Sequence, residues 1–329
     1  MQSRAVVFES VGRASVIDIE TPPPGPGELG IRVESSVISP GTELRCLFGT
    51  QPNLPDPPFV PGYAAAGVVV EAEPGLTGWL GRRVFFRGTS KASVALSWGG
   101  HVGHAVTSID SVIEIPDGVN TVASPLARLF GIANRGLALT QPRANQTVGV
   151  VGLGIIGQCS ARLFHAAGCR VVGVDNIPAR VESLRGVGVE AVVVGELASE
   201  ALLSACPDGV DILVDATGSE KVLNEAVAAT KSKAWGDATS PCPQVVIQGS
   251  YPTTFEVDYH TFFRKEATVH FPRDTTAADT IAVLDLMASH QLEYSDLLTW
   301  VGPPEDAQEI YSRLADREPG LLTGAFVWE

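Results

Sequence analysis

The pattern of apolar and polar positions changes near residue 121. Before that point, short β-rich segments such as AVVFES, LGIRVESSVIS and AAGVVVEAE are separated by turns rich in Pro and Gly, among them TPPPGPGE and QPNLPDPPFVPG. Short strands at this spacing are typical of a compact, barrel-like β domain and not of a layered α/β sheet. The first part of the chain therefore predicts a β-barrel domain.

After residue 121 the pattern alternates between strands and helices. Apolar strands such as TVGVVG, CRVVGVD, VDILVDAT and QVVIQGS are separated by segments with helical spacing, at residues 155–168, 178–187, 197–205 and 219–230. Strands that are apolar throughout are typical of a parallel sheet covered by helices on both sides. The second part therefore predicts a doubly wound α/β domain, followed after residue 272 by one more helix and a mixed tail.

Composition narrows the class of protein. A chain of 329 residues suits two domains, and no apolar run reaches the roughly 18 residues that a membrane helix needs. The five cysteines form no C-x-x-C pair, which argues against a structural zinc or a disulfide framework and indicates a reducing cytoplasm. The net charge of −14 argues against a nucleic-acid partner, because phosphate binding needs a basic surface.

The segment TVGVVGLGIIGQ carries a dinucleotide-binding pattern. Gly152, Gly154 and Gly157 form G-x-G-x-x-G directly after a strand and at the start of a helix. The first glycine permits a tight turn, the second lets the backbone approach a pyrophosphate, and the third allows the helix to pack closely on the strand. The amides near Ile155 and Ile156 would then face the phosphates at the positive end of the helix dipole.

An acid follows this pattern at the end of the next strand. Asp175 in CRVVGVD stands 18 residues after Gly157, where an acid accepts hydrogen bonds from both ribose hydroxyls of NAD and repels the additional phosphate of NADP. We therefore predict NAD(H) as the cofactor in preference to NADP(H), and we include the nearby Arg180 in the cofactor site. The alternative is a glycine-rich turn that binds nothing, with Asp175 acting as a helix N-cap.

Two later strand ends belong to the same predicted sheet. VDATGS ends in Thr217, Gly218 and Ser219, and VVIQGS ends in Gly249 and Ser250. Ligands of open parallel sheets bind beyond the carboxyl ends of the strands, so Thr217, Gly218, Gly249 and Ser250 are expected to line the nicotinamide half of the cleft. An ordinary tight turn is the alternative for each of these residues.

These segments together resemble the medium-chain dehydrogenase/reductase superfamily. The markers are PPPGPGELGIRVESSVISPGTE, PFVPGYAAAGVVVEAE, GLGIIG, DATGS and FFRKEATVH, and the Pro-Gly-Thr-Glu and Pro-Gly-Tyr-Ala pieces are most similar to the bacteriochlorophyllide a dehydrogenase-like branch. The resemblance implies an α/β protein with a GroES-like β-barrel catalytic domain at residues 1–121, completed by residues 273–329. It also implies a Rossmann NAD-binding domain at residues 122–272, and a homodimer formed through the edge of the dinucleotide sheet.

The resemblance also indicates where a catalytic zinc would bind. Zinc-dependent members use a Cys, a His and a further Cys or Glu, and these positions fall here at Pro40, at Tyr63 and near Ser124. Proline has no side-chain donor atom, and neither Tyr nor Ser is a usual zinc ligand. The four-cysteine structural zinc lobe of the superfamily is missing as well. We therefore predict an enzyme that uses no zinc or other metal.

Chemistry at a substrate oxygen without zinc needs a protein group that donates a hydrogen bond and exchanges a proton. Thr42 matches the superfamily's Ser or Thr that starts a proton relay, and its alternative role is a helix N-cap. Tyr63 occupies the vacated histidine position as a donor and weak acid, or as a ring that packs beneath the nicotinamide. Glu43 matches an acid behind the site that orients its neighbours.

Two cationic residues are candidates for the substrate site. Arg128 in SPLARLF would meet an anionic substrate, and Lys265 in RKEATVH matches a superfamily position that is sometimes basic and close to the substrate. A solvated surface side chain is the alternative for both. His101 and His104 in GGHVGHAV would point to opposite faces of a strand, which makes them poor joint metal ligands and indicates structural or surface histidines.

The predicted function is that of a zinc-independent, NAD(H)-dependent oxidoreductase that interconverts a secondary alcohol and a ketone on a small molecule, in specialised metabolism. One alternative is a double-bond reductase of the enoyl or quinone type, which a clear preference for NADPH would favour. Another is a catalytically silent dinucleotide-binding protein. A protein whose bound NADH responds to no alcohol or ketone would favour that second alternative.

Overall fold

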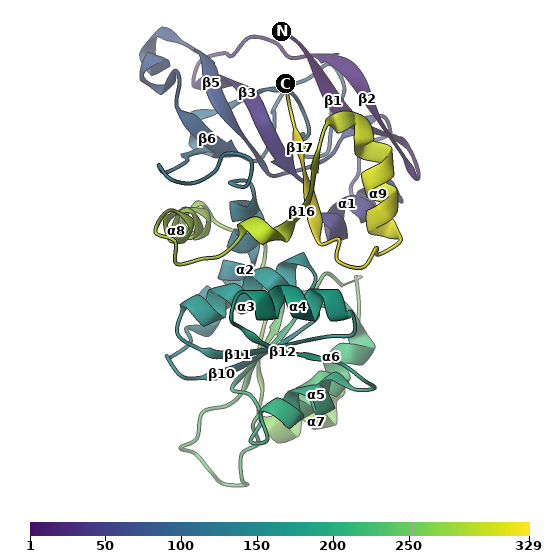
Figure 1. The fold of residues 1–329 in the computed structure, drawn as a ribbon, viewed down its shortest axis with the longest axis vertical. Helices are drawn as coiled ribbons and strands as arrows, with labels where there is room; N and C mark the ends of the chain where they lie inside the picture. Colours follow the sequence, from purple (N-terminus) through teal and green to yellow (C-terminus); the bar gives the residue numbers. More distant parts are fainter. Residues whose placement is uncertain (252) are drawn as a thin grey trace. The chain divides into compact units, whose positions relative to one another are not determined.

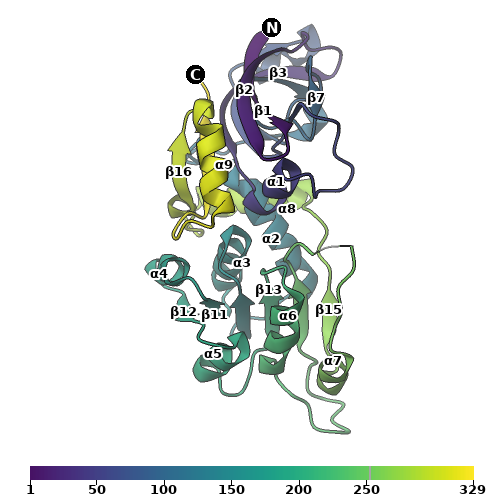
Figure 2. The ribbon, with the colours of Figure 1, turned by 90° about the vertical axis from the view of Figure 1, so that its right-hand side faces the viewer.

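The computed structural model describes residues 1–251 and 253–329, which form two compact units (Figures 1 and 2). The first unit consists of Met1–Arg128, Leu284–Ser289 and Tyr294–Glu329, and the second of Leu129–Val283 and His290–Glu293. We predicted domain boundaries at residues 121 and 272. The boundaries at Arg128/Leu129 and Val283/Leu284 fall inside two helices, α2 (Leu126–Thr140) and α8 (Ala277–Ala288).

The first unit is built mainly from antiparallel strands. One sheet has the order β2-β1-β4-β7 and the other the order β16-β17-β3-β5-β6-β9, with β8 also paired to β3. The strands are β1 Gln2–Ser10, β2 Arg13–Glu20, β3 Glu28–Val37, β4 Phe59–Val60, β5 Ala65–Ala72, β6 Arg83–Phe86, β7 Ala95–Leu96, β8 His104–Ser108, β9 Val112–Glu114, β16 Leu298–Gly302 and β17 Thr323–Val327. This confirms the prediction of a β-rich first part within an α/β protein.

The core of the first unit combines both ends of the chain. In β3 the side chains of Ile31 and Val33 are buried while Arg32 between them is exposed, as the alternation of a strand requires. The C-terminal strand β17 pairs antiparallel with β3, and helix α9 (Ala307–Ala315) packs Tyr311 near Phe326 in the same core. Burial of each such side chain stabilises the fold by about 1.5–3 kcal/mol. The C-terminal tail is therefore an integral part of the first unit.

The second unit contains a parallel sheet with the order β12-β11-β10-β13-β14-β15. Its strands are β10 Thr147–Val151, β11 Arg170–Asp175, β12 Glu190–Val193, β13 Ile212–Asp215, β14 Gln244–Ile247 and β15 Thr268–His270. Figure 2 shows helices on both sides of this sheet. Separate apolar clusters fill the two faces, one under α3 and α4 and the other under α5 and α6. The predicted Rossmann architecture is confirmed.

The helices of the second unit lie close to their predicted positions. They are α3 Ile155–Ala166, α4 Pro178–Gly186, α5 Ala198–Ala205 and α6 Glu220–Ala226. The last predicted helix, at 219–230, is shorter than expected because the chain tightens after Ala226 into the 3₁₀ turn η3 (Val227–Ala229). Helices α7 Tyr259–Lys265 and α9 were not predicted, and α1 Pro40–Leu47 was indicated only through the alternative role of Thr42 as a helix N-cap. Helices α1 and α7 are only about two turns long.

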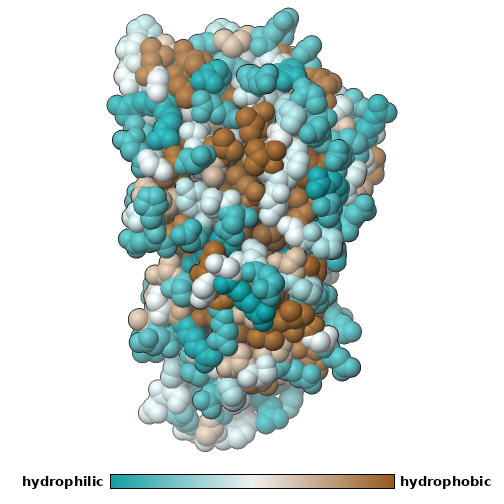
Figure 3. All heavy atoms as spheres, in the orientation of Figure 1, coloured by the Kyte–Doolittle hydropathy of each residue, from teal (hydrophilic) through white to brown (hydrophobic). Residues whose placement is uncertain are grey.

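Short 3₁₀ helices occur elsewhere, at η1 Pro74–Trp79, η2 Ile109–Ser111, η4 Ser295–Leu297 and η5 Pro304–Asp306. Figure 3 shows apolar residues interspersed with polar ones on the drawn faces of both units, as on most globular surfaces. Within the described residues, every helix is too short or too polar to cross a lipid bilayer.

Candidate functional site

The glycine-rich turn of the second unit has the geometry that a dinucleotide requires. Gly152 follows β10 with a φ of 85°, a left-handed conformation that glycine adopts without strain. A Cβ atom on Gly157 would lie 1.7 Å from the carbonyl oxygen of Gly152, so a side chain there would push α3 away from the turn. A Cβ atom on Gly154 would have Nη1 of Arg180, at 3.9 Å, as its nearest neighbour. The first amides of α3 are therefore accessible to a pyrophosphate.

Asp175 ends β11, and its carboxylate organises the turn beside the glycines. Oδ2 accepts a hydrogen bond from the amide of Leu153 at 2.7 Å, and Oδ1 accepts one from the amide of Ile177 at 2.8 Å. Nη1 of Arg180 lies 3.6 Å from Oδ2. The N-cap of α4 is Ile177, so the alternative role of Asp175 as that cap is wrong. Each carboxylate oxygen keeps a lone pair for a ribose hydroxyl, and the guanidinium is a possible phosphate partner.

The two later strand ends lie against each other. Gly218 has a φ of 67°, and a Cβ atom on it would lie 2.6 Å from the carbonyl oxygen of Ser250. A Cβ atom on Gly249 would lie 2.4 Å from the amide nitrogen of Gly218. The turns after β13 and β14 therefore approach backbone to backbone, which brings Thr217, Gly218, Gly249 and Ser250 together at the carboxyl edge of the sheet.

A buried acid at this edge was missed by the sequence analysis. Asp215, the last residue of β13, accepts a hydrogen bond from the Thr217 hydroxyl at 2.6 Å and another from the Tyr251 hydroxyl at 2.7 Å. Burial raises the pKa of the Asp215 carboxyl, and burial together with the nearby carboxylate raises the pKa of Tyr251. The sequence signal that could have identified Asp215 is an acid at the end of the largely apolar strand segment DILVD. Asp215 ties the two turns together from below the cofactor edge.

In the first unit, three hydroxyl groups meet at the start of helix α1. The hydroxyl of Tyr63 donates to Oγ of Ser39 at 2.5 Å and lies 3.3 Å from Oγ1 of Thr42. Ser39 is the N-cap of α1, so the alternative role of Thr42 as that cap is wrong. Tyr63 is 7% exposed, and burial raises the pKa of its hydroxyl. Ser39 was not predicted, although it directly precedes the first zinc position.

Glu43 lies behind these hydroxyls and is completely buried. Its Oε1 accepts a hydrogen bond from the amide of Ser39 at 2.7 Å. Its Oε2 accepts one from Nε2 of His101 at 2.9 Å and one from the Tyr311 hydroxyl at 2.5 Å. Burial, and next the Glu43 carboxylate, raise the pKa of Tyr311 well above its usual value. The carboxylate is thus fully engaged in fixing the start of α1, which agrees with an orienting role.

The hydrogen bonds around His101 indicate its tautomer. Nδ1 of His101 lies 2.8 Å from Oγ of Ser36, and Nε1 of Trp328 donates to the same oxygen at 3.0 Å. If Nε2 carries the proton that points to Glu43, the Ser36 hydroxyl donates to Nδ1 and accepts from Trp328. Each donated proton in this series of hydrogen bonds then has an acceptor. His101 is therefore a structural histidine, as predicted.

His104 takes a different position from His101. It lies in β8, where its Nδ1 is 2.7 Å from the Thr21 hydroxyl and its Nε2 is 3.5 Å from Glu71. Burial lowers the pKa of this histidine. The two histidines therefore belong to separate hydrogen-bond networks.

Comparison with known proteins shows what this chain is similar to. A family model described as zinc-binding dehydrogenase matches residues 156–271. The chain is 28% identical to 2-desacetyl-2-hydroxyethyl bacteriochlorophyllide A dehydrogenase of Rhodobacter capsulatus and 26% identical to the protein of that name from Cereibacter sphaeroides, in both cases over 100% of this chain and 99% of the relative.

Solved structures share the fold. The 2R,3R-butanediol dehydrogenase of Bacillus subtilis superposes with a TM-score of 0.86 at 20% identity, over 100% of both chains. An Escherichia coli alcohol dehydrogenase with bound NADH has a TM-score of 0.85 at 20% identity, and a putative zinc-binding dehydrogenase of Sinorhizobium meliloti with bound NADP has 0.84 at 22%, each over 99% of both chains. The family-model match and the two full-length relatives support the assignment of this chain to the medium-chain dehydrogenase/reductase superfamily, and the solved structures show its fold. The chain is a dehydrogenase-type oxidoreductase.

The three superfamily positions for catalytic zinc do not form a metal site from these residues. Pro40 begins α1 and offers no donor atom, and the Tyr63 hydroxyl is bonded to Ser39. The hydroxyl of Ser124 donates to the carbonyl oxygen of Thr121 at 2.9 Å. Over residues 1–251 and 253–329, no group of His, Cys, Asp and Glu is arranged to hold a metal ion. The donor set is unlike that of a zinc-dependent member of the superfamily.

Arg128 lies beside the hydroxyl cluster of the first unit. Its guanidinium carbon is 5.4 Å from the centre of the Tyr63 ring, and the residue is 4% exposed. The alternative of a solvated surface arginine is therefore wrong. The guanidinium makes a cation–π contact with the tyrosine ring, and its role toward an anionic substrate stays a prediction.

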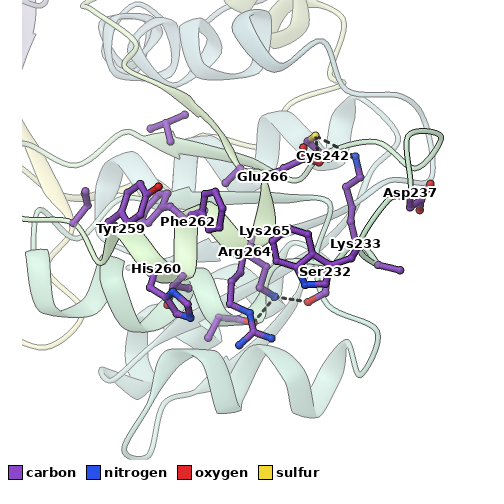
Figure 4. Close-up of a pocket in the computed structure, with 18 of the residues that line it drawn as sticks. Ser232, Lys233, Asp237, Cys242, Tyr259, His260, Phe262, Arg264, Lys265 and Glu266 are labelled. Carbon is purple, nitrogen blue, oxygen red and sulfur yellow. Dashed lines mark hydrogen bonds and ion pairs between the residues drawn. The ribbon is translucent and has the colours of Figure 1, made fainter.

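Lys265 lies at the opposite edge of the Rossmann sheet from the predicted cofactor residues. Its ammonium donates to the carbonyl oxygen of Ala228 at 3.0 Å and to that of Thr230. It also donates to the Ser232 hydroxyl at 2.9 Å (Figure 4). Thr230 pairs with Val210, which precedes the first residue of β13, so Lys265 lies at the amino ends of the strands. The turns predicted to bind the cofactor follow the carboxyl ends of the strands. Burial lowers the pKa of this lysine. These contacts correct the prediction of a substrate role, because they make Lys265 a structural residue.

Proposed function

We propose that this dehydrogenase uses NAD(H), needs no zinc, and interconverts a secondary alcohol and a ketone on a small molecule. The observation that supports the proposal is the cluster of hydroxyls of Ser39, Thr42 and Tyr63 at the superfamily's metal positions. Such a cluster offers what zinc offers elsewhere, namely stabilisation of charge at a substrate oxygen and a route for its proton.

Tyr63 is the proposed donor to the substrate oxygen. Because burial raises its pKa, the hydroxyl stays protonated at neutral pH, as a proton donor must be. The Arg128 guanidinium over the ring would stabilise negative charge when that proton leaves. Ser39 and Thr42 are within hydrogen-bond range of the same hydroxyl and would return a proton to it. Glu43 acts through the Ser39 amide and is a positioning residue.

The second unit would hold the cofactor through three groups of residues. The amides of Gly154, Ile155 and Ile156 would bind the pyrophosphate, Asp175 the adenosine ribose, and the turns at Thr217 and Gly249 the nicotinamide half. Bound nicotinamide would supply or accept the hydride. We propose NAD over NADP because the Asp175 carboxylate would repel a 2′-phosphate, although Arg180 lies beside it.

Alcohol oxidation in the presence of a chelator tests this function. We expect purified protein to reduce NAD with a panel of secondary alcohols at a rate that a strong chelator leaves unchanged, because no step depends on a metal. The measurement is NADH absorbance with and without 1,10-phenanthroline. Loss of activity on chelation, with recovery on adding zinc, would contradict the metal-free proposal. Reduction of activated double bonds with NADPH, and no alcohol oxidation, would contradict the proposed reaction.

We further propose a homodimer formed through strand β15. This strand is the edge of the sheet, and its Val269 is 36% exposed, followed by Phe271 at 63%. Tyr259 stacks on Phe263 nearby, and both rings line a hollow of about 1200 Å³ with Trp235 (Figure 4). A second copy would pair with the edge and cover these apolar side chains.

A charge on each sheet edge tests the dimer. Val269→Lys should weaken self-association by about 100-fold, because an ammonium group would be buried in the interface. The matched control is Val193→Lys on β12, the other edge, where the native side chain is 40% exposed. Analytical ultracentrifugation measures both. A monomeric wild-type protein, or dissociation by the control substitution alone, would refute the proposed interface.

The proposed setting is specialised metabolism in the cytoplasm. The full-length relatives act, by their names, on a bacteriochlorophyllide, which supports a specialised small-molecule substrate here. All five cysteines lie in the described residues and none of them forms a disulfide there, as suits a reducing compartment.

A further inference from the structure

The backbone at Trp98 adopts a conformation that a bulky side chain rarely takes. Its φ is 69°, in the left-handed region where the Cβ atom crowds the backbone. Neighbouring contacts hold it there. The amide of Ser97 donates to the carbonyl oxygen of Val60 at 2.8 Å, and the amide of Gly100 donates to that of Pro61 at 3.0 Å. The loop is therefore fixed on both sides of the strained residue.

Close backbone packing beneath the loop reinforces this conformation. A Cβ atom on Gly88 would lie 2.2 Å from the carbonyl oxygen of Trp98, and one on Gly100 would lie 2.6 Å from the carbonyl carbon of Gly62. The loop thus rests on the turn that carries Tyr63. Strain of this kind persists where the surroundings impose it, and it is often found at functional sites.

The strained backbone places the indole beside the proposed proton donor. The ring centres of Trp98 and Tyr63 are 5.2 Å apart with an angle of 78°, an edge-to-face arrangement. Trp98 is 38% exposed, whereas Tyr63 is 7% exposed. The indole therefore covers the tyrosine ring on one side and offers apolar surface to solvent on the other.

We propose that Trp98 determines substrate specificity by binding a planar aromatic group of the substrate next to its reacting oxygen. The inference rests on the proposed function, because it takes Tyr63 as the donor to that oxygen. Aromatic rings pack favourably on an exposed indole in stacked or edge-to-face geometry, and this gain is absent for a small aliphatic group. The substrate class is thus an aryl-substituted alcohol or ketone, in preference to a short alkyl one.

Trp98→Gly tests the proposal, because glycine accepts the same φ without strain. We expect the thermal midpoint to equal or exceed that of the wild type. The ratio of kcat/KM for 2-acetylnaphthalene to that for 2-butanone, both measured with NADH, should fall roughly tenfold or more. The matched control is Asn53→Gly, an exposed residue of the same unit with a φ of 59°, which should leave the ratio unchanged.

The outcomes separate this inference from the proposed function. If the wild type reduces both ketones and Trp98→Gly leaves their ratio unchanged, the specificity role is refuted while the function stands. If both activities fall equally, the indole merely supports Tyr63, and the inference is again refuted. If the wild type reduces neither ketone, the proposed function fails. In that case, saturation-transfer NMR tests the aromatic contact without turnover. A 2-acetylnaphthalene signal that is present with the wild type and lost with Trp98→Gly supports the contact, and equal signals with both proteins refute it.

Discussion

Replacing Tyr63 with phenylalanine should lower kcat for alcohol oxidation by roughly 10²–10³-fold. The substitution keeps the ring's contacts with Trp98 and with the Arg128 guanidinium, and removes only the hydroxyl that bonds to Ser39. The substrate oxygen then loses its proton donor, while the aromatic packing is retained. KM should change by much less than kcat, because the lost contact is strongest in the transition state.

The measurement is steady-state kinetics with NAD and a secondary alcohol, together with the thermal midpoint. Stability should fall by only about 0.5–1.5 kcal/mol, the usual value of one hydrogen bond. Tyr294→Phe is a suitable control, since that tyrosine is half-buried, lies in the first unit and takes no part in the hydroxyl cluster at α1. A kcat within threefold of the wild type for Tyr63→Phe would remove Tyr63 from the proposed mechanism and leave the oxidoreductase assignment intact.

Asp175→Asn should change the preference for NAD over NADP by about 10²–10³-fold in the ratio of kcat/KM values. The wild-type carboxylate would accept from the ribose hydroxyls and repel a 2′-phosphate. The amide removes that repulsion but keeps an oxygen that can accept from the Leu153 or Ile177 amide. The Arg180 guanidinium, 3.6 Å from Oδ2, is then available to attract the phosphate.

Two further variants make this test specific. Asp175→Asn with Arg180→Ala should lose most of the gain with NADP, because the proposed phosphate partner is gone. Glu182→Gln removes one negative charge from α4, the helix that carries Arg180, at a residue that pairs with Arg185. It should leave the ratio of kcat/KM for NAD to that for NADP unchanged. If Asp175→Asn binds both cofactors less tightly with an unchanged ratio, Asp175 shapes the turn without selecting the cofactor.

Most of the second unit could be predicted from local sequence. The strands at residues 147–151 and 170–175 have apolar interiors and alternate with helical segments, so periodicity was sufficient to indicate a Rossmann sheet. The glycines were equally informative, since the close approach of α3 to Gly152 requires them. The helical interior of α2 and α8, where the two units divide, carries no local boundary signal.

The hydroxyl cluster was only partly predictable. Thr42 and Tyr63 were identified by their places in the superfamily pattern. Ser39 was missed because serine before proline is common in turns, and its role depends on a tyrosine 24 residues away. Lys265 was placed by sequence position alone, and its contacts with Ala228 and Ser232 come from helix α7, which no pattern had indicated.

The sequence by itself determined the two kinds of domain and the dinucleotide turn, because each depends on residue types at short, regular spacing. Only the tertiary structure decided which side chains surround the hydroxyls. Glu43 meets His101 from 58 residues away and Tyr311 from 268 residues away. Such contacts arise where separate elements pack in one core, and the distance along the chain carries no information about them.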